Sequence, residues 1–309
     1  MTLSFGYLGP EATFTEAALL QLLEARGRTD AARVPMRGAD AALAAVAAGE
    51  LGAAVVPIEN SLEGGVPATL DALTQHGRLQ IIAETVVRVR FVLAAGPGVG
   101  VDEVRAFSTH PHAEAQTRAW LSDHLPAAHY IPAASTAAAA RDLGTGEVDY
   151  QAAICPALAA ERYGLTVLAD DIGDRKDADT RFVLVSTARE LPAPTGADKT
   201  TLVAALASDR AGALLELLEQ FSTRGVNLSR IESRPTGDGL GLYQFSIDAQ
   251  GHIAEPRMAE ALTGVHRIAR RVQFLGSYPS ADGEKVIVDP DMTAQAFAAA
   301  HDWLEAIRR

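Results

Sequence analysis

The sequence predicts an α/β protein in two parts: sheets covered by helices over residues 1–190, then a ferredoxin-like βαββαβ domain over residues 199–278. Three observations predict it. Short apolar runs alternate with Ala- and Leu-rich helical stretches in the first part, which is typical of mostly parallel sheets. A linker rich in proline and glycine occupies residues 191–198. Beyond it, the order of elements changes to strand, helix, strand, strand, helix, strand.

Each element of the first part follows from its local pattern. Short apolar runs bounded by turn residues predict strands at residues 3–8, 33–36, 53–56, 79–95, 105–108, 129–131, 152–154, 166–168 and 179–185. Helices are expected at residues 14–26, 40–48, 66–76, 111–124, 136–143 and 157–163. Thr13 and Glu16 fit a capping box, so the first helix should begin at Phe14. The long extended run 79–95 could carry the chain between two lobes with a cleft between them.

The second part has its own pattern. Strands are expected at residues 200–207, 226–234, 242–248 and 271–277, with helices at 212–224 and 256–265. Gly237, Asp238 and Gly239 supply a hairpin between the two middle strands. The tail, residues 293–307, is an amphipathic helix. Its side chains available for packing are Phe297, Ala300, Trp303, Leu304 and Ile307.

Composition restricts the class of protein. The 309 residues suffice for more than one domain, and 48% hydrophobic with 21% charged residues is typical of a globular protein. No apolar run could span a bilayer and the first residues lack a signal-peptide pattern, so we expect a cytoplasmic protein without membrane contact. The single cysteine, Cys155, excludes an intramolecular disulfide and should pack as a small buried residue. A net charge of −12 argues against a nucleic-acid partner.

Polar side chains gather where the expected strand 53–56 ends. Glu59, Asn60 and Ser61 follow that strand and precede Gly64 and Gly65, which allow a ligand to approach the backbone. Ligands of open α/β sheets bind at the carboxyl ends of strands. The segment therefore indicates a binding site, although a strand-to-helix turn with a serine cap has the same pattern.

A second polar pair, Thr180 and Arg181, begins an apolar strand. A threonine hydroxyl donates a proton from a stiff side chain, and arginine binds a carboxylate through two parallel hydrogen bonds. A β-branched residue at a strand start needs no functional reason, however. This segment alone therefore favours the structural interpretation.

Helix N-termini supply positive potential for an anionic ligand. The turns before residues 14, 111 and 136 combine hydroxyl groups with free backbone N–H groups, which together bind carboxylates or phosphates. Other kinds of site are poorly supported. His110 and His112 lack the further ligands of a metal site, and no glycine-rich nucleotide motif follows a strand.

Taken together, several ordered segments resemble the motifs of the prephenate dehydratase family with a C-terminal ACT regulatory domain. The matching segments are residues 7–14, 56–64, 108–111, 135–137 and 180–182, followed by 212–215 and 231–235. The resemblance covers residues 3–278. Four positions depart from the family's usual residues: Ala12 replaces glycine, Thr15 serine, His112 glutamine and Asp177 asparagine.

The resemblance implies a two-lobed catalytic domain of the periplasmic-binding-protein-like type II fold over residues 1–190, an ACT domain over 199–278 and a tail over 279–309. The lobes would comprise about 1–78 plus 164–187, and 79–163. It implies conversion of prephenate into phenylpyruvate, carbon dioxide and water in phenylalanine biosynthesis, without metal or cofactor. Thr180 would be the catalytic acid. The substrate-binding residues would be Thr13, Asn60, Ser61, His110, Ser135, Thr136, Arg181 and Phe182.

The resemblance also implies feedback regulation. L-Phenylalanine would bind the ACT domains as an allosteric effector, between the subunits of a homodimer or homotetramer. The expected contacts are Gly212, Ala213, Leu214 and Leu215 of one subunit with Asn227, Glu232, Ser233, Arg234 and Pro235 of another. The alternative is a non-enzymatic small-anion binding protein with an amino-acid-sensing domain. The motif at 180–182, together with residues 56–61, favours the enzyme.

Overall fold

The computed structural model describes residues 4–146, 148–187, 190–236 and 242–308. Contacts between residues divide the chain into two compact units. The first comprises Met1–Thr69 with Thr85–Leu184, and the second Leu70–Glu84 with Val185–Arg309. Residues 70–84 lie in the first half of the sequence, but they pack with the second unit.

The first sheet has the strand order β2-β1-β3-β11-β5, with the short strand β4 beside β3. Its strands are β1 (Ser4–Leu8), β2 (Ala32–Met36), β3 (Ala53–Asn60), β4 (Gly64–Gly65), β5 (Gln80–Arg88) and β11 (Asp179–Ser186). The accompanying helices are α1 (Phe14–Glu24), α2 (Ala39–Ala47) and α3 (Pro67–Gln75). β1 runs parallel to both β2 and β3, as the alternation of strands and helices predicts.

The second sheet has the order β10-β6-β9-β7-β8. Its strands are β6 (Val92–Ala95), β7 (Ala106–Thr109), β8 (His129–Pro132), β9 (Ala152–Cys155) and β10 (Thr166–Ala169). It is a mixed sheet, because β6 runs antiparallel to both of its neighbours while β7 is parallel to β8 and β9.

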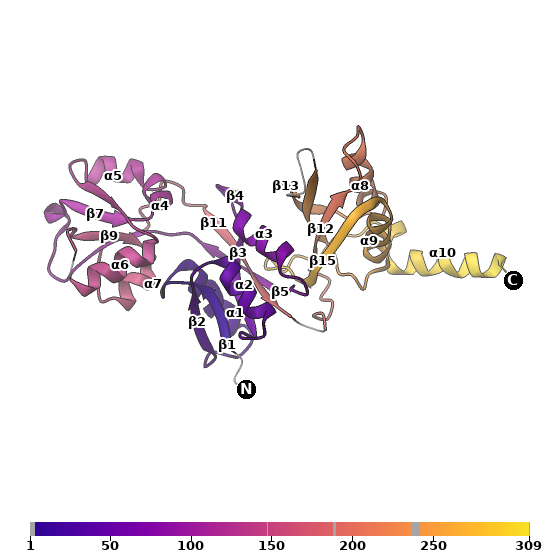
Figure 1. The fold of residues 1–309 in the computed structure, drawn as a ribbon, viewed down its shortest axis with the longest axis horizontal. Coiled ribbons are helices and arrows are strands. Elements are labelled where there is room, and N and C mark those ends of the chain that lie inside the picture. The colour runs from indigo at the N-terminus through magenta and orange to yellow at the C-terminus, as the bar shows by residue number, and fades with distance from the viewer. Residues whose placement is uncertain (1–3, 147, 188–189, 237–241, 309) are drawn as a thin grey trace. The chain divides into compact units, whose positions relative to one another are not determined.

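Helices cover both faces of this second sheet. They are α4 (Pro111–Ala115), α5 (Arg118–His124), α6 (Thr136–Thr145) and α7 (Ala157–Arg162), with α4 and α5 on one face and α6 and α7 on the other (Figure 1). In β6, Leu93 packs into the core on one face, whereas Val92 and Ala94 pack into the core on the other. A strand covered on both faces is apolar throughout, which explains the unbroken apolar run in the sequence.

The structure differs from the expected elements at three places. The run 79–95 is two strands, β5 in the first sheet and β6 in the second, so it does carry the chain from one sheet to the other. The chain crosses at 89–91 and returns at 170–178, which differs from the lobe boundaries expected near 79 and 164. β3 continues past Val56 to Asn60, because its end pairs with β4.

The third difference is a break in the helix expected over residues 111–124. Thr117 is buried, and its hydroxyl donates to the carbonyl of Ala113 at 2.8 Å. The Asp174 carboxylate accepts the N–H groups of Ala119 at 3.1 Å and Trp120 at 3.3 Å. A distant carboxylate thus caps a new helix start, which periodicity could not reveal.

The second unit contains the expected βαββαβ order. Its elements are β12 (Asp198–Leu206), α8 (Ala213–Ser222), β13 (Leu228–Pro235), β14 (Tyr243–Gln250), α9 (Pro256–Ile268) and β15 (Ala269–Pro279). The sheet order is β13-β14-β12-β15 with antiparallel pairing, which confirms the ferredoxin-like fold. The hairpin expected at residues 237–239 lies outside the described residues.

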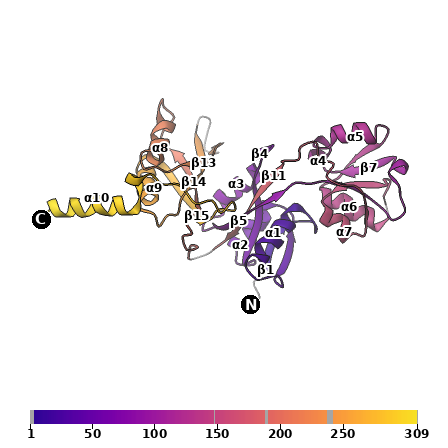
Figure 2. The same ribbon diagram turned by 180° about the vertical axis from the view of Figure 1, so that it is seen from behind.

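The tail forms α10 (Ala294–Ile307), close to the helix predicted over 293–307, and Thr293 caps its start. α10 extends away from α9 (Figure 2). None of its residues is fully buried. Phe297 near its start is half-buried and lines a pocket with Glu260 of α9, whereas Trp303 near its end is 64% exposed. No helix in the described ranges combines the length and the apolar character that crossing a membrane requires.

Candidate active site and effector pocket

A cleft of about 320 Å³ lies in the first unit. Six of the predicted site residues line it, from loops and strand ends of both sheets: Thr13, Asn60, His110, Ser135, Thr136 and Thr180. Ser61, Arg181 and Phe182 do not belong to its lining. Residues that are far apart in the sequence therefore meet at one concave site.

The centre of the cleft is a hydrogen bond between Asn60, at the end of β3, and Thr180, near the start of β11. The Asn60 side-chain amide donates to Thr180 Oγ1 at 2.8 Å. Thr180 is only 8% exposed, so its hydroxyl is largely shielded from bulk water. Because the oxygen accepts from Asn60, its own hydrogen remains available to a ligand in the cleft.

The orientation of the Asn60 amide follows from its other bonds. Asn60 Oδ1 accepts the backbone N–H groups of Leu62 at 2.9 Å and Glu63 at 3.1 Å. Both are donors, so the oxygen must face them and the NH₂ group must face Thr180. The tight β3–β4 hairpin thus fixes which end of the amide reaches the threonine.

Ser61 reinforces the same arrangement from outside the lining. Its backbone N–H donates to the carbonyl of Asp179 at 2.9 Å, and its hydroxyl accepts the N–H of Asp179 at 3.0 Å. These two bonds join the hairpin to the residue that precedes Thr180. In this structure Ser61 therefore positions Thr180.

Helix starts surround the cleft. Thr13 caps α1 by accepting the N–H of Glu16 at 3.2 Å, and Ser135 caps α6 by accepting the N–H of Ala138 at 3.0 Å. His110 precedes α4, and its Nδ1 accepts the N–H of His112 at 3.3 Å. The positive ends of these helices face one cavity, which favours an anionic ligand.

The capping box expected at α1 is altered. The Glu16 carboxylate accepts the N–H of Ala12 at 2.5 Å rather than that of Thr13. Ala12 has φ of 64°, in the left-handed region that favours glycine, and it is fully buried. This explains physically why glycine is usual at this position in the family that the sequence resembles.

Histidines and aromatic rings complete the lining. Burial lowers the pKa of His110 below its ordinary value, and neighbouring His112 lowers it further, so His110 is neutral near pH 7. His112 Nδ1 lies 3.1 Å from the Glu63 carboxylate. Phe14 and Phe91 pack edge to face with 5.7 Å between ring centroids and supply an apolar wall. Glu63, Phe14 and Phe91 were not among the predicted site residues, because no local pattern distinguishes them until both sheets are assembled.

Arg181 lies beside the cleft rather than in it. Its guanidinium pairs with the Glu59 carboxylate at 3.3 Å, and the residue is 8% exposed. Successive strand residues point to opposite faces, so Thr180 and Arg181 cannot both face the cavity. Among the described residues that line the cleft there is no lysine or arginine.

Other sequence expectations can be placed directly. Cys155 is buried, and burial raises the pKa of its thiol to about 12, so it packs as a small apolar residue as predicted. Within the described ranges, no group of three His, Cys, Asp or Glu side chains has the arrangement of a metal site.

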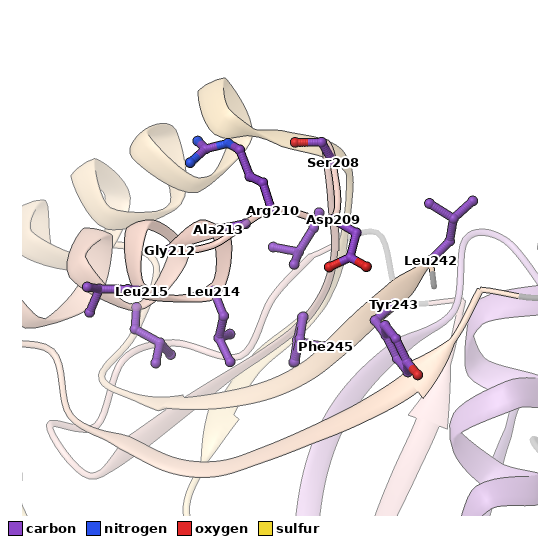
Figure 3. Close-up of a pocket in the computed structure, with 12 residues that line it drawn as sticks. Ser208, Asp209, Arg210, Gly212, Ala213, Leu214, Leu215, Leu242, Tyr243 and Phe245 are labelled. Atoms are coloured by element: carbon purple, nitrogen blue, oxygen red, sulfur yellow. The ribbon is translucent and has the colours of Figure 1, made fainter. Parts of the chain in front are cut away.

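A second pocket, of about 590 Å³, lies at the start of α8 in the second unit. It includes the four predicted residues Gly212, Ala213, Leu214 and Leu215. Figure 3 shows Leu214 pointing from α8 toward the strand that carries Tyr243 and Phe245. Gly212 has φ of 85°, which suits glycine at this tight helix start.

The other predicted effector residues lie outside this pocket. Asn227 donates to Gln250 Oε1 at 3.1 Å, and the segment Glu232–Pro235 lies on β13. β13 is an edge strand of the sheet, and its Ile231 is 44% exposed. Only the first group of predicted residues therefore lines this pocket, although Pro235 pairs with the lining residue Tyr243 on the neighbouring strand.

The fold and the two sites define a regulated α/β protein of the two-lobed binding-protein type, with a polar cleft and a C-terminal ligand-sensing domain. Residues 5–190 match the model of the family described as prephenate dehydratase, and residues 200–267 match that of the ACT domain. The chain belongs to the prephenate dehydratase family.

Individual relatives agree over nearly the full length. A prephenate dehydratase of Amycolatopsis methanolica is 45% identical over 304 residues, covering 98% of this chain and 97% of that protein. The crystal structure of prephenate dehydratase from Arthrobacter aurescens in complex with L-Phe is 53% identical, with a TM-score of 0.93 over 99% of each chain. A structure described as GqqA, a novel type of quorum quenching acylase, is 30% identical with a TM-score of 0.79, covering 90% of this chain and 98% of that one.

Proposed function

We propose that this chain converts prephenate into phenylpyruvate, with loss of carbon dioxide and water, under feedback control by L-phenylalanine. The observation that carries the catalytic part is the Asn60–Thr180 hydrogen bond at 2.8 Å in a cleft surrounded by helix starts. The identity of the substrate is inferred from membership of the family, because the fold alone does not determine function.

The chemistry requires an acid more than a nucleophile. The carbon–carboxylate bond of prephenate breaks, its electron pair moves into the ring, and the ring carbon–oxygen bond breaks as aromaticity is restored. Hydroxide leaves poorly, so the Thr180 O–H gives its proton to the departing oxygen as that bond lengthens. Water then returns a proton to the threonine.

Asn60 makes a weak acid more effective. An N–H donor on Oγ1 stabilises the negative charge that develops when the threonine releases its proton. The amide is already oriented by the hairpin, so no reorganisation is needed during the reaction. Orientation and electrostatic preorganisation therefore supply most of the acceleration.

Helix starts and polar side chains hold the two carboxylates of prephenate. Thr13, His110, Ser135 and Thr136 present hydrogen-bonding groups around the cavity, and Phe14 with Phe91 contacts the apolar ring. Arg181 lies beside the cleft with its charge paired to Glu59. Direct contact between Arg181 and a substrate carboxylate requires the Arg181–Glu59 pair to open.

L-Phenylalanine binds at the start of α8. The pocket has apolar side chains for a phenyl ring, and helix N–H groups for a carboxylate. The edge strand β13 of a second copy completes the site with Asn227 and Glu232–Pro235. This arrangement makes the protein a homodimer or homotetramer assembled through its ACT domains, and a cytoplasmic location remains our expectation.

One assay tests the proposed function. The purified protein is mixed with prephenate, and phenylpyruvate is measured by its absorbance in alkali. Steady production that L-phenylalanine suppresses supports the enzyme. Binding of prephenate without any turnover would instead support the alternative, a small-anion binding protein with an amino-acid-sensing domain.

A further inference from the structure

Residues 70–84 belong to the second unit and are continuous, at both ends along the chain, with segments that line the cleft. This segment comprises the second half of α3, a loop and the first half of β5, and it packs with the second unit. Just before α3 lie Asn60 and Glu63, and just after β5 lie Val89 and Phe91. All four line the cleft.

Specific bonds attach this segment to the regulatory sheet. The Asp71 carboxylate of α3 pairs with the Arg234 guanidinium of β13 at 2.8 Å. The Gln273 amide of β15 donates to the carbonyl of Leu73 at 2.9 Å. Both contacts hold the last turns of α3 to strands of the sensing domain.

The β5 end is attached more rigidly. The Glu84 carboxylate is fully buried, pairs with Lys199 at 2.8 Å and accepts the N–H of Ala281 at 2.8 Å. Gly276 lies so close to β5 that a Cβ there would sit 2.2 Å from the carbonyl oxygen of Ile81. This end is therefore a fixed anchor, whereas the α3 end depends on two partly exposed polar contacts.

One hydrogen-bond donor at the α3 end has no partner in the described part of the chain. Arg234 Nε is buried and has no hydrogen-bond partner among the described residues. A buried polar atom without a partner costs roughly 1–3 kcal/mol. The ion pair therefore leaves part of the Arg234 guanidinium unsatisfied.

Arg234 belongs to the predicted effector motif, so the same residue serves sensing and attachment. We propose, on the basis of the function above, that the Asp71–Arg234 ion pair transmits phenylalanine binding to the cleft. A ligand that reorients Arg234 loosens α3 from β13. Movement of α3 acts on the β3–β4 hairpin that precedes it, which pairs Asn60 with Gly64 and orients the Asn60 amide toward Thr180. Asp71 is thus a positioning residue that touches neither ligand.

The test uses the full-length enzyme and the variant Asp71→Asn, which keeps the shape and removes the charge. Turnover is measured across phenylalanine concentrations, and phenylalanine binding is measured separately by calorimetry. We expect effector binding to persist and turnover without phenylalanine to fall toward the inhibited rate, because the variant loosens the same contact. The ratio of uninhibited to fully inhibited rate should therefore fall by up to about fivefold. This size corresponds to one partly exposed ion pair.

Three further variants make the result decisive. Gln273→Ala removes the second α3 contact and should weaken the response in the same direction, whereas Asp71→Glu should restore it. Glu305→Gln is the matched control, because Glu305 pairs with Arg308 at 2.9 Å on α10 with similar carboxylate exposure. If Asp71→Asn and Gln273→Ala are inhibited as fully as wild type, the transmission proposal is wrong. If wild type makes no phenylpyruvate, the proposed function itself fails.

Discussion

Asn60 donates its side-chain amide to the hydroxyl of Thr180 at 2.8 Å, across 120 positions of sequence. The contact joins the end of β3 to the start of β11. It leaves the threonine hydrogen free for a ligand while supporting the charge that forms when that hydrogen leaves. The functional hypothesis depends on this pair more than on any other contact.

Asn60→Asp tests the donor half of the pair. The carboxylate has the same shape but accepts the Thr180 hydrogen instead of donating to its oxygen, so the acid is drawn away from the substrate. We expect kcat to fall about tenfold or more with a smaller change in KM, by analogy with loss of one preorganised donor. Steady-state kinetics on prephenate provides the measurement, and an unchanged kcat would remove Asn60 from the catalytic arrangement.

Arg181→Lys tests whether the guanidinium beside the cleft contributes to binding. Loss of the planar fork should raise KM for prephenate several-fold. Glu59→Gln separates two explanations: it removes the charge of the Glu59 partner and keeps its shape, so KM should not rise if Arg181 acts on the substrate. Arg118→Lys on α5, an exposed arginine that pairs with Glu114 at 2.8 Å and does not line the cleft, is the control for loss of a guanidinium. Equal KM values for Arg181→Lys and wild type would mean that Arg181 serves packing alone.

Gly212→Val tests the effector pocket in the intact chain. A Cβ at Gly212 meets no atom within 4 Å, so the added side chain projects into open space where phenylalanine is proposed to bind. We expect the phenylalanine concentration for half-inhibition to rise about tenfold or more. Gly283→Val is a matched control, with positive φ of 64° and equally open surroundings outside the pocket. Similar inhibition of both variants would argue against the assigned pocket.

Truncation is a less suitable test of regulation. Removing the chain beyond Pro192 deletes the partners of Leu73, Ile81 and Glu84, which are buried within the second unit. Loss of activity after such a cut could be caused by the exposure of residues 70–84 to solvent and would not report on regulation. Substitutions in the full-length protein avoid this.

Ala12→Gly tests the backbone interpretation of the first motif. Relief of left-handed strain, about 1–2 kcal/mol, should offset the lost methyl burial and the added chain entropy. The free energy of unfolding should therefore change by less than about 1 kcal/mol. Ala139→Gly, an equally buried alanine inside α6 in the same core, should cost about 1–2 kcal/mol. Urea denaturation of both variants measures these changes. Equal losses of unfolding free energy in Ala12→Gly and Ala139→Gly would contradict the strain argument.

The sequence predicted most elements because their patterns are local. The apolar runs of β1, β9 and β12 and the βαββαβ order of the second unit are each visible within a few residues. Contacts across the chain escaped prediction. The break between α4 and α5 depends on Asp174, and the extension of β3 to Asn60 depends on its pairing with Gly64.

The candidate site divides in the same way. Thr180 and Asn60 were identified singly, but neither pattern shows that one donates to the other. Side chains alternate between the two faces of β11, and Arg181 points to the face where it meets Glu59. The sequence motif does not show which of these faces borders the cleft. Packing of residues 70–84 with the second unit also becomes evident only from three-dimensional contacts.

Turnover by Thr180→Val tests the central claim most directly. Valine keeps the branched shape that suits β11 and removes only the O–H group, so binding should change little while the acid is lost. We expect kcat for phenylpyruvate formation to fall by about 10²–10⁴-fold with a much smaller change in KM. Thr180→Ser, which retains the hydroxyl, should recover part of the rate. A Thr180→Val enzyme with near wild-type kcat would contradict the assignment of Thr180 as the acid.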